Sequence, residues 1–90
     1  MTEITVGELL IQCLKAENVE MMFGIIDGSH IPFVVHAPRY GIRHINCRHE
    51  EGAVHLAEGY ARISGKPGIV FGSPGPGGAN MLAGLASAHA

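Results

Sequence analysis

Three short apolar runs, separated by segments of helical periodicity, are the feature that most limits how this chain can fold. The runs cover residues 19–26, 42–47 and 68–72, and none shows the strict polar alternation of a half-exposed strand. Strands of this kind are typical of a parallel sheet that helices cover on both faces. The order helix, strand, helix, strand, helix, strand, helix therefore predicts an α/β fold, doubly wound, with a mostly parallel sheet and flanking helices.

Two of the predicted helices are well marked. Thr5 and Glu8 have the spacing of a capping box at the start of the first helix, which runs to about Glu17. The helix at 50–64 ends at a Gly-Lys-Pro turn, residues 65–67. The residues expected to be buried are Val6, Leu9, Leu10, Cys13 and Leu14 in the first helix, and Ala53, Leu56, Ala57, Tyr60 and Ala61 in the second.

The remaining segments are less regular. Residues 31–37 form a weaker helical segment in which Pro32 fits the first turn. A loop rich in proline and glycine is expected at 73–78, followed by a helix over 79–90 that ends without a cap. Three strands make a small sheet, so we interpret residues 1–90 as the first part of one domain that is incomplete here.

Composition excludes several classes of protein. The 90 residues carry a net charge of −2 and no basic patch, so no nucleic-acid partner is expected. The chain has no apolar run of the length that crosses a membrane and no basic, signal-like N-terminus, so we expect no membrane partner and a cytoplasmic location. Cys13 and Cys47 lack metal or redox spacing and are expected to be reduced thiols.

Five motifs occur along the chain in a fixed order. They are Phe-Gly at 23–24, RHEEGA at 48–53, AEGYAR at 57–62, GKPG at 65–68 and GPGGAN at 75–80. Together they resemble the pyrimidine-binding domain at the N-terminus of thiamine-diphosphate-dependent enzymes of the acetolactate synthase and benzoylformate decarboxylase type. That domain carries His-Glu-x-x-Ala, Gly-Tyr-Ala-Arg and Gly-Lys-Pro-Gly at similar spacing. The resemblance spans nearly the whole chain.

The resemblance implies a cofactor, a substrate class and an assembly. It implies thiamine diphosphate, with the diphosphate held through Mg²⁺ by a second domain that is absent from these residues. That domain belongs to a neighbouring subunit, so a homodimer or homotetramer is implied. The substrate would be a small 2-oxo acid, and the reaction a lyase or transferase reaction that forms or cleaves a carbon–carbon bond. A requirement for FAD stays open.

Glu50 is the candidate catalytic residue. Positions three and seven residues after it are Ala53 and Ala57, whereas Glu51 leads into a largely polar stripe, so Glu50 should point inward. Periodicity alone leaves open whether it acts in catalysis or only complements the helix dipole. The resemblance implies that Glu50 hydrogen-bonds a ring nitrogen of the cofactor's aminopyrimidine and favours the tautomer that takes the proton from the thiazolium carbon.

Further site residues follow from the loops. The resemblance puts Pro76, Gly77 and Asn80 beside the cofactor, although Asn80 could instead cap a helix or form a local turn. Gly28, Ser29, His30 and Ser73 would face the substrate, and His30 fits an ordinary helix start equally well. In this first loop the family often has Pro-Gly, where the chain has Ile26 and Asp27. No metal site is expected, because His49 and His55 lack a third ligand at metal spacing.

Two other functions stay open. The chain could be a non-catalytic or regulatory homologue that keeps the domain without its chemistry. It could also be a nucleotide-binding α/β module that uses the glycine-rich loop. The second alternative is weakened by the lack of a Gly-Lys-Ser/Thr sequence and by Pro76, which has no backbone N–H to offer a phosphate.

Overall fold

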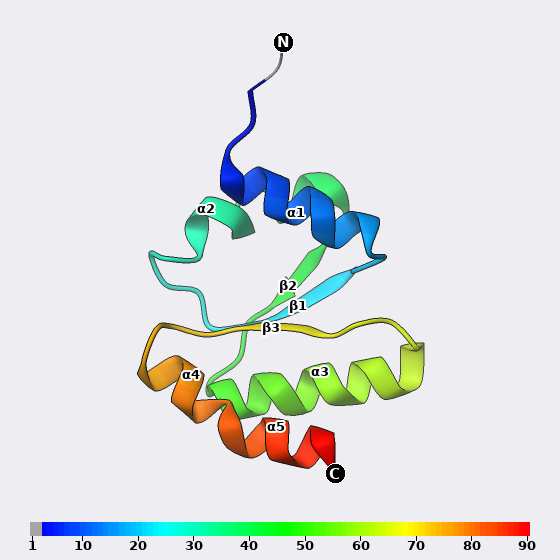
Figure 1. Cartoon of the computed structure of the whole chain (residues 1–90), viewed down its shortest axis with the longest axis vertical. Coiled ribbons are helices and arrows are strands. Elements are labelled where there is room, and N and C mark those ends of the chain that lie inside the picture. Colours follow the sequence, from blue (N-terminus) through cyan, green and yellow to red (C-terminus); the bar gives the residue numbers. More distant parts are fainter. Residues whose placement is uncertain (1–2) are drawn as a thin grey trace.

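A parallel sheet lies between two layers of helices in the computed structural model, which describes residues 3–90 (Figure 1). The helices are α1 (Val6–Ala16), α2 (Ile31–Val34), α3 (Glu50–Ser64), α4 (Pro76–Asn80) and α5 (Leu82–His89), with a 3₁₀ turn η1 (Ala37–Tyr40). The strands are β1 (Met21–Gly24), β2 (Arg43–Ile45) and β3 (Ile69–Phe71). The predicted α/β fold and the order of its elements are confirmed, and the strands are shorter than the apolar runs that predicted them.

The sheet has the strand order β2-β1-β3, and both strand pairs are parallel. Met22 at the centre of β1 pairs with His44 on one side and with Ile69 on the other. After β1 the chain forms β2 on one side of it, and later β3 on the other side. The strand order therefore reverses at β1. In open α/β sheets, ligands bind outside the carboxyl ends of the strands at such a point.

Each face of the sheet has its own core. Met22 and Phe71 pack with Ile11 of α1 on the face that α1 and α2 cover, whereas Phe23 packs with Ala53 and Ala57 of α3 on the other. Neighbouring residues of a strand point to opposite faces. Both Met22 and Phe23 are therefore buried, which explains why the run lacks polar alternation.

Local signals fix the ends of the main helices. Thr5 Oγ1 accepts a hydrogen bond of 3.1 Å from the backbone N–H of Glu8, as the capping box predicts. The reciprocal half of the box is missing, because the Glu8 carboxylate accepts instead from Arg39 and Tyr40 and so ties α1 to η1. At the other well-marked helix, α3 ends at Gly65, whose φ of 73° is the left-handed conformation that glycine tolerates.

The predicted buried face of α1 is wrong at four of its five residues, and only Leu14 packs, partly buried, against the core. Ile11 is fully buried, whereas Val6 is 84% exposed and Leu9, Leu10 and Cys13 are also exposed. Helix α1 packs closely against α2 at Gly7, where a Cβ atom would come within 2.0 Å of the Pro32 carbonyl oxygen. Because α1 carries apolar residues around most of its circumference, the pattern could not show which side faces the sheet; this close contact does.

Two further expectations need correction. In α3, Ala53 and Ala57 are buried as predicted, but Leu56 is 48% exposed and Val54 is buried instead. Val54 is covered because Gly84 of α5 packs directly against it. The segment 73–78 is not all loop, since α4 begins at Pro76, where the absent N–H of proline is not needed by the helix.

Candidate functional site

The three segments that leave the carboxyl ends of the strands carry the predicted site residues. β1, β2 and β3 end at Gly24, Ile45 and Phe71. Downstream of these ends lie the loop with Gly28, Ser29 and His30, the start of α3 at Glu50, and the segment from Ser73 to Asn80. Because all strands are parallel, the three segments gather at one edge of the sheet.

Glu50 is buried at this edge. It is the first residue of α3, its exposed fraction is 9%, and its Oε1 atom accepts a hydrogen bond of 3.1 Å from the side-chain amide of Asn80. The Asn80 amide, followed by the backbone N–H of Glu50 itself, holds the pKa of the Glu50 carboxyl below its usual value, against the opposing effect of burial. The inward orientation that the helix face predicted is observed, and the carboxyl is ionised at neutral pH.

Glu51 contrasts with its neighbour. Its side chain is 44% exposed, and Oε2 lies 3.1 Å from Nε2 of His55, one turn further along α3. Surface pairs of this kind contribute little to stability. The two adjacent carboxylates therefore occupy different environments, as the sequence predicted.

Glycines let α4 approach Glu50. A Cβ atom on Gly77 would lie 3.0 Å from the Gly72 carbonyl carbon and 3.4 Å from Oε2 of Glu50. Asn80 is the last residue of α4 and reaches across to Glu50, so it acts neither as a helix cap nor in a local turn. Gly77 and Asn80 are therefore brought to Glu50, whereas Pro76 is exposed at the start of α4.

Asp27 joins two of the three segments, and the sequence reasoning did not select it. Its Oδ1 accepts a hydrogen bond of 2.8 Å from the backbone N–H of Ser29, and its Oδ2 accepts one from the hydroxyl of Ser73. Hydrogen bonds from the Ser29 and Ser73 hydroxyls, and then from the Ser29 backbone, lower the pKa of Asp27 from 3.8 to about 2. An Asp-Gly-Ser sequence after a strand signals a local turn, but not the contact with a residue 46 positions away.

His30 is a buried histidine, and one of its ring nitrogens accepts a hydrogen bond from the backbone. Only 4% of the residue is exposed, and its ring lies 4.7 Å from the ring of Phe71 and 5.9 Å from that of Phe33, centroid to centroid. Its Nδ1 accepts a hydrogen bond of 3.0 Å from the backbone N–H of Asp27, so the neutral ring carries its proton on Nε2. Gly28 is exposed, with open space where a Cβ atom would stand, and is not drawn into this cluster.

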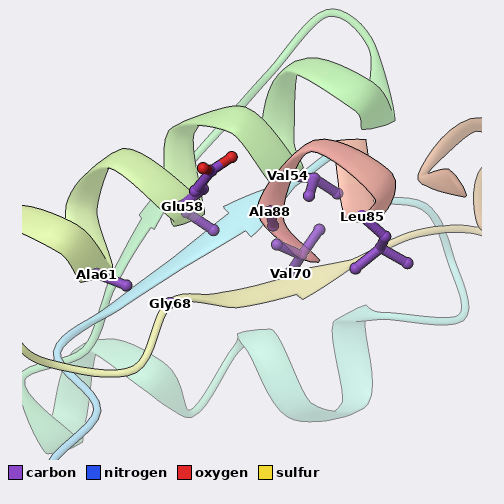
Figure 2. A pocket seen from close by; sticks show the side chains of 8 residues that line it. Val54, Glu58, Ala61, Gly68, Val70, Leu85 and Ala88 are labelled. Carbon is purple, nitrogen blue, oxygen red and sulfur yellow. The ribbon is translucent and has the colours of Figure 1, made fainter. Parts of the chain in front are cut away.

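A pocket elsewhere in the structure does not include Glu50. It lies between α3, β3 and α5 and has a cavity volume of about 180 Å³ (Figure 2). Figure 2 shows the side chains of Val54, Val70 and Leu85 around it, with Glu58 as the charged side chain at its margin. Sequence reasoning assigned no role to these residues.

None of the helices described in residues 3–90 is long and apolar enough to cross a membrane. Within the same residues, no group of three or more His, Cys, Asp or Glu side chains is placed to hold a metal ion.

Comparison with known proteins identifies relatives along almost the whole chain. The family described as "Thiamine pyrophosphate enzyme, N-terminal TPP binding domain" matches residues 4–90. The acetolactate synthase large subunit of Lactococcus lactis is 45% identical over 84 residues, which are 92% of this chain and 15% of that protein. A probable acetolactate synthase large subunit of Methanococcus aeolicus is 43% identical over 83 residues, 92% of this chain and 14% of that protein.

A third relative carries a different activity in its name. The probable 2-ketoarginine decarboxylase of Pseudomonas aeruginosa is 40% identical over 87 residues, 97% of this chain and 16% of that protein. The chain thus spans 14–16% of the length of these three relatives. The resemblance that the motifs indicated is confirmed: the chain belongs to the thiamine pyrophosphate enzymes, and it matches their N-terminal TPP-binding domain.

Proposed function

We propose that this chain contributes Glu50 as the carboxylate that engages the aminopyrimidine ring of thiamine diphosphate in an enzyme acting on small 2-oxo acids. The observation that carries the proposal is the placement of Glu50. It is an ionised, buried side chain at the carboxyl edge of a parallel sheet, where a second residue fixes one of its oxygens. A carboxylate that only complemented the helix dipole would not need a dedicated partner 30 residues away.

The two carboxylate oxygens of Glu50 fit different tasks. Oε1 is taken by Asn80. Within residues 3–90, Oε2 receives no hydrogen bond from another residue's side chain, and a Cβ atom at Gly77 would stand 3.4 Å from it. An ionised oxygen with a free lone pair can accept a hydrogen bond from a ring N–H and exchange a proton with it. This carboxylate oxygen therefore suits contact with an aminopyrimidine nitrogen.

Each nearby residue has a part in this proposal. When bound, thiamine diphosphate supplies the carbon nucleophile and the electron sink needed for bond cleavage or formation next to a carbonyl. Glu50 would hold and transfer the proton at the pyrimidine nitrogen. Asn80 would keep the carboxylate in one rotamer, and Gly77, with Pro76 before it, would bring the backbone of α4 close to the ring.

The substrate would lie beside the loops that follow β1 and β3. We propose that Gly28, Ser29, His30 and Ser73 face it, because they lie in the segments that follow β1 and β3 at the same edge of the sheet as Glu50. The relatives' names include acetolactate synthases and a 2-ketoarginine decarboxylase. Decarboxylation followed by release or capture of the acyl group is the reaction class that we propose.

Completion of the active site requires further protein. No Gly-Asp-Gly segment occurs in the 90 residues, and such a segment begins the diphosphate-binding motif of the family that the sequence resembles. We propose that residues 1–90 form the first part of the pyrimidine-binding domain, and that a diphosphate-binding domain of a neighbouring subunit holds the diphosphate through Mg²⁺. We propose that the subunits form a homodimer or homotetramer, because the site is shared between chains, and that the enzyme is cytoplasmic; a requirement for FAD remains open.

The experiment is a matched pair of substitutions in the full-length enzyme. Glu50→Gln preserves volume but removes the carboxylate that can take up and return a proton, so we expect thiamine diphosphate affinity to change only a few-fold while turnover of pyruvate or 2-oxobutyrate falls by about 10² or more. Glu51→Gln, one residue along and half exposed, should retain turnover. Wild-type turnover by the Glu50→Gln enzyme would refute the proposal.

A further inference from the structure

The hydrogen bond from Ser73 to Asp27 connects the segments that follow two neighbouring strands. The hydroxyl of Ser73 donates to Oδ2 of Asp27, which lies 46 positions earlier in the chain. Asp27 follows β1 and Ser73 follows β3, and these two strands pair in parallel. The contact therefore closes the carboxyl edge of the sheet between its central strand and one outer strand.

Asp27 is a fixed anchor in this contact. Its other oxygen accepts from the backbone N–H of Ser29 at 2.8 Å, and its own N–H is bound by Nδ1 of the buried His30 at 3.0 Å. The hydrogen bonds from Ser29 and Ser73 hold the pKa of Asp27 at about 2, so the carboxylate stays charged at neutral pH. Hydrogen bonds to a charged acceptor are roughly twice as strong as those between neutral groups.

Ser73 is also hydrogen-bonded to α4, so its contact with Asp27 restrains that helix. Its carbonyl oxygen accepts a hydrogen bond of 3.1 Å from the backbone N–H of Gly78, in the middle of that helix. The Cβ position of Gly77 lies 3.2 Å from Cβ of Ser73, so the turn between them is tightly packed. Two residues beyond Gly78, at the end of the same helix, Asn80 holds Glu50.

We propose that Asp27 is a positioning residue that acts through Ser73 and α4 to hold Asn80 against Glu50. The consequence for catalysis rests on the function proposed above, whereas the mechanical coupling does not. α4 has only five residues and cannot be stable by itself, so its placement must come from contacts outside it. Misplacement of a supporting residue by about 1 Å is enough to lower a reaction rate substantially.

The coupling can be measured without any cofactor. Hydrogen–deuterium exchange of the full-length, ligand-free protein would be followed in peptides that cover residues 73–82. Loss of a charge-assisted hydrogen bond should make exchange in Asp27→Ala and in Ser73→Ala about ten-fold faster there. Ser64→Ala removes a serine hydroxyl that bonds only within and just after α3, and it serves as the matched control with exchange unchanged.

Two further variants distinguish the loss of this one hydrogen bond from general destabilisation of the fold. Ser73→Thr keeps the hydroxyl and should restore slow exchange. The double variant Asp27→Ala/Ser73→Ala should exchange no faster than Asp27→Ala, because that substitution already removes the bond to Ser73. Unchanged exchange in Ser73→Ala, or strictly additive effects in the double variant, would overturn the proposal.

The link to Glu50 has its own readout. In the same ligand-free protein with ¹³C-labelled glutamate, the titration of the Glu50 carboxyl, assigned by its disappearance in Glu50→Gln, should move to higher pH in Ser73→Ala and stay in place in Ser64→Ala. A Glu50 titration that Ser73→Ala leaves in place would overturn the link. Wild-type turnover by Glu50→Gln, together with a moved titration, would refute the proposed function and leave the positioning role standing.

Discussion

The side-chain amide of Asn80 donates a 3.1 Å hydrogen bond to Oε1 of Glu50 and so joins the last residue of α4 to the first residue of α3. These two residues lie after different strands and meet only because the sheet is parallel. The contact explains how a carboxylate can be buried and yet remain ionised, since a hydrogen bond to the charged form offsets the effect of burial. It also determines which carboxylate oxygen is left for a ligand.

Removal of that amide should change the titration of Glu50. In Asn80→Ala the largest contribution that lowers the pKa of Glu50 disappears while the side chain stays buried, so its pKa should rise toward the ordinary value. We expect a loss of turnover of about ten-fold in the full-length enzyme, as for a lost hydrogen bond to a charged group. Asn46→Ala, at an exposed asparagine between β2 and α3, is the control and should leave the titration as in the wild type. A Glu50 titration in Asn80→Ala that matches the wild type would contradict this role of Asn80.

The close approach of α4 can be tested with adjacent glycines. Gly77→Ala would place a methyl group 3.0 Å from the Gly72 carbonyl carbon and beside Glu50, so we expect the free energy of unfolding to fall by about 1–3 kcal/mol. Gly78→Ala meets nothing within 4 Å and should be neutral or slightly stabilising, because alanine favours a helix. Thermal unfolding of both variants gives the comparison. Equal melting temperatures would show that α4 does not pack as described.

The packing of α5 on α3, away from the proposed site, can be tested in the same way by melting temperature. A Cβ atom on Gly84 would lie 2.6 Å from Cβ of Val54, so Gly84→Ala should push α5 off α3 and lower the melting temperature. Gly59→Ala, on α3 but with nothing within 4 Å, is the control and should not lower it. If Gly84→Ala melts with the wild type, the two helices are not in the contact that forms the pocket in Figure 2.

Acid stability should depend on Asp27. Its pKa is lowered from 3.8 to about 2 by the hydrogen bonds from Ser29 and Ser73, so the stabilisation is present above the unfolded value and is lost as the pH falls through the folded one. Between pH 4 and pH 2.5, the melting temperature of Asp27→Asn should therefore decline less steeply than that of the wild type. Glu17→Gln, an exposed acid at the end of α1, removes the same charge and should keep the wild-type slope. Equal slopes in all three proteins would mean that Asp27 is not held as the structure shows.

Local patterns predicted the fold better than they predicted contacts. The bounds of α3 and the inward orientation of Glu50 follow from helical periodicity and from the Gly65 terminator, which are properties of neighbouring residues. The buried face of α1 could not be predicted, because that helix is apolar on several sides and the Gly7–Pro32 contact decides its orientation. Hydrogen bonds that join residues 30 and 46 positions apart leave no local signal, so the partners of Glu50 and Asp27 emerged only from the structure.

Removal of the thiazolium proton from bound thiamine diphosphate is the step that Glu50 is proposed to support, and its rate can be measured directly. The full-length enzyme loaded with cofactor is mixed with D₂O, quenched in acid, and the remaining proton signal is read by NMR. If Glu50 exchanges a proton with the pyrimidine ring, Glu50→Gln should slow this exchange by about 10² or more while Glu51→Gln leaves it unchanged. An exchange rate in Glu50→Gln equal to that of the wild type would contradict the account.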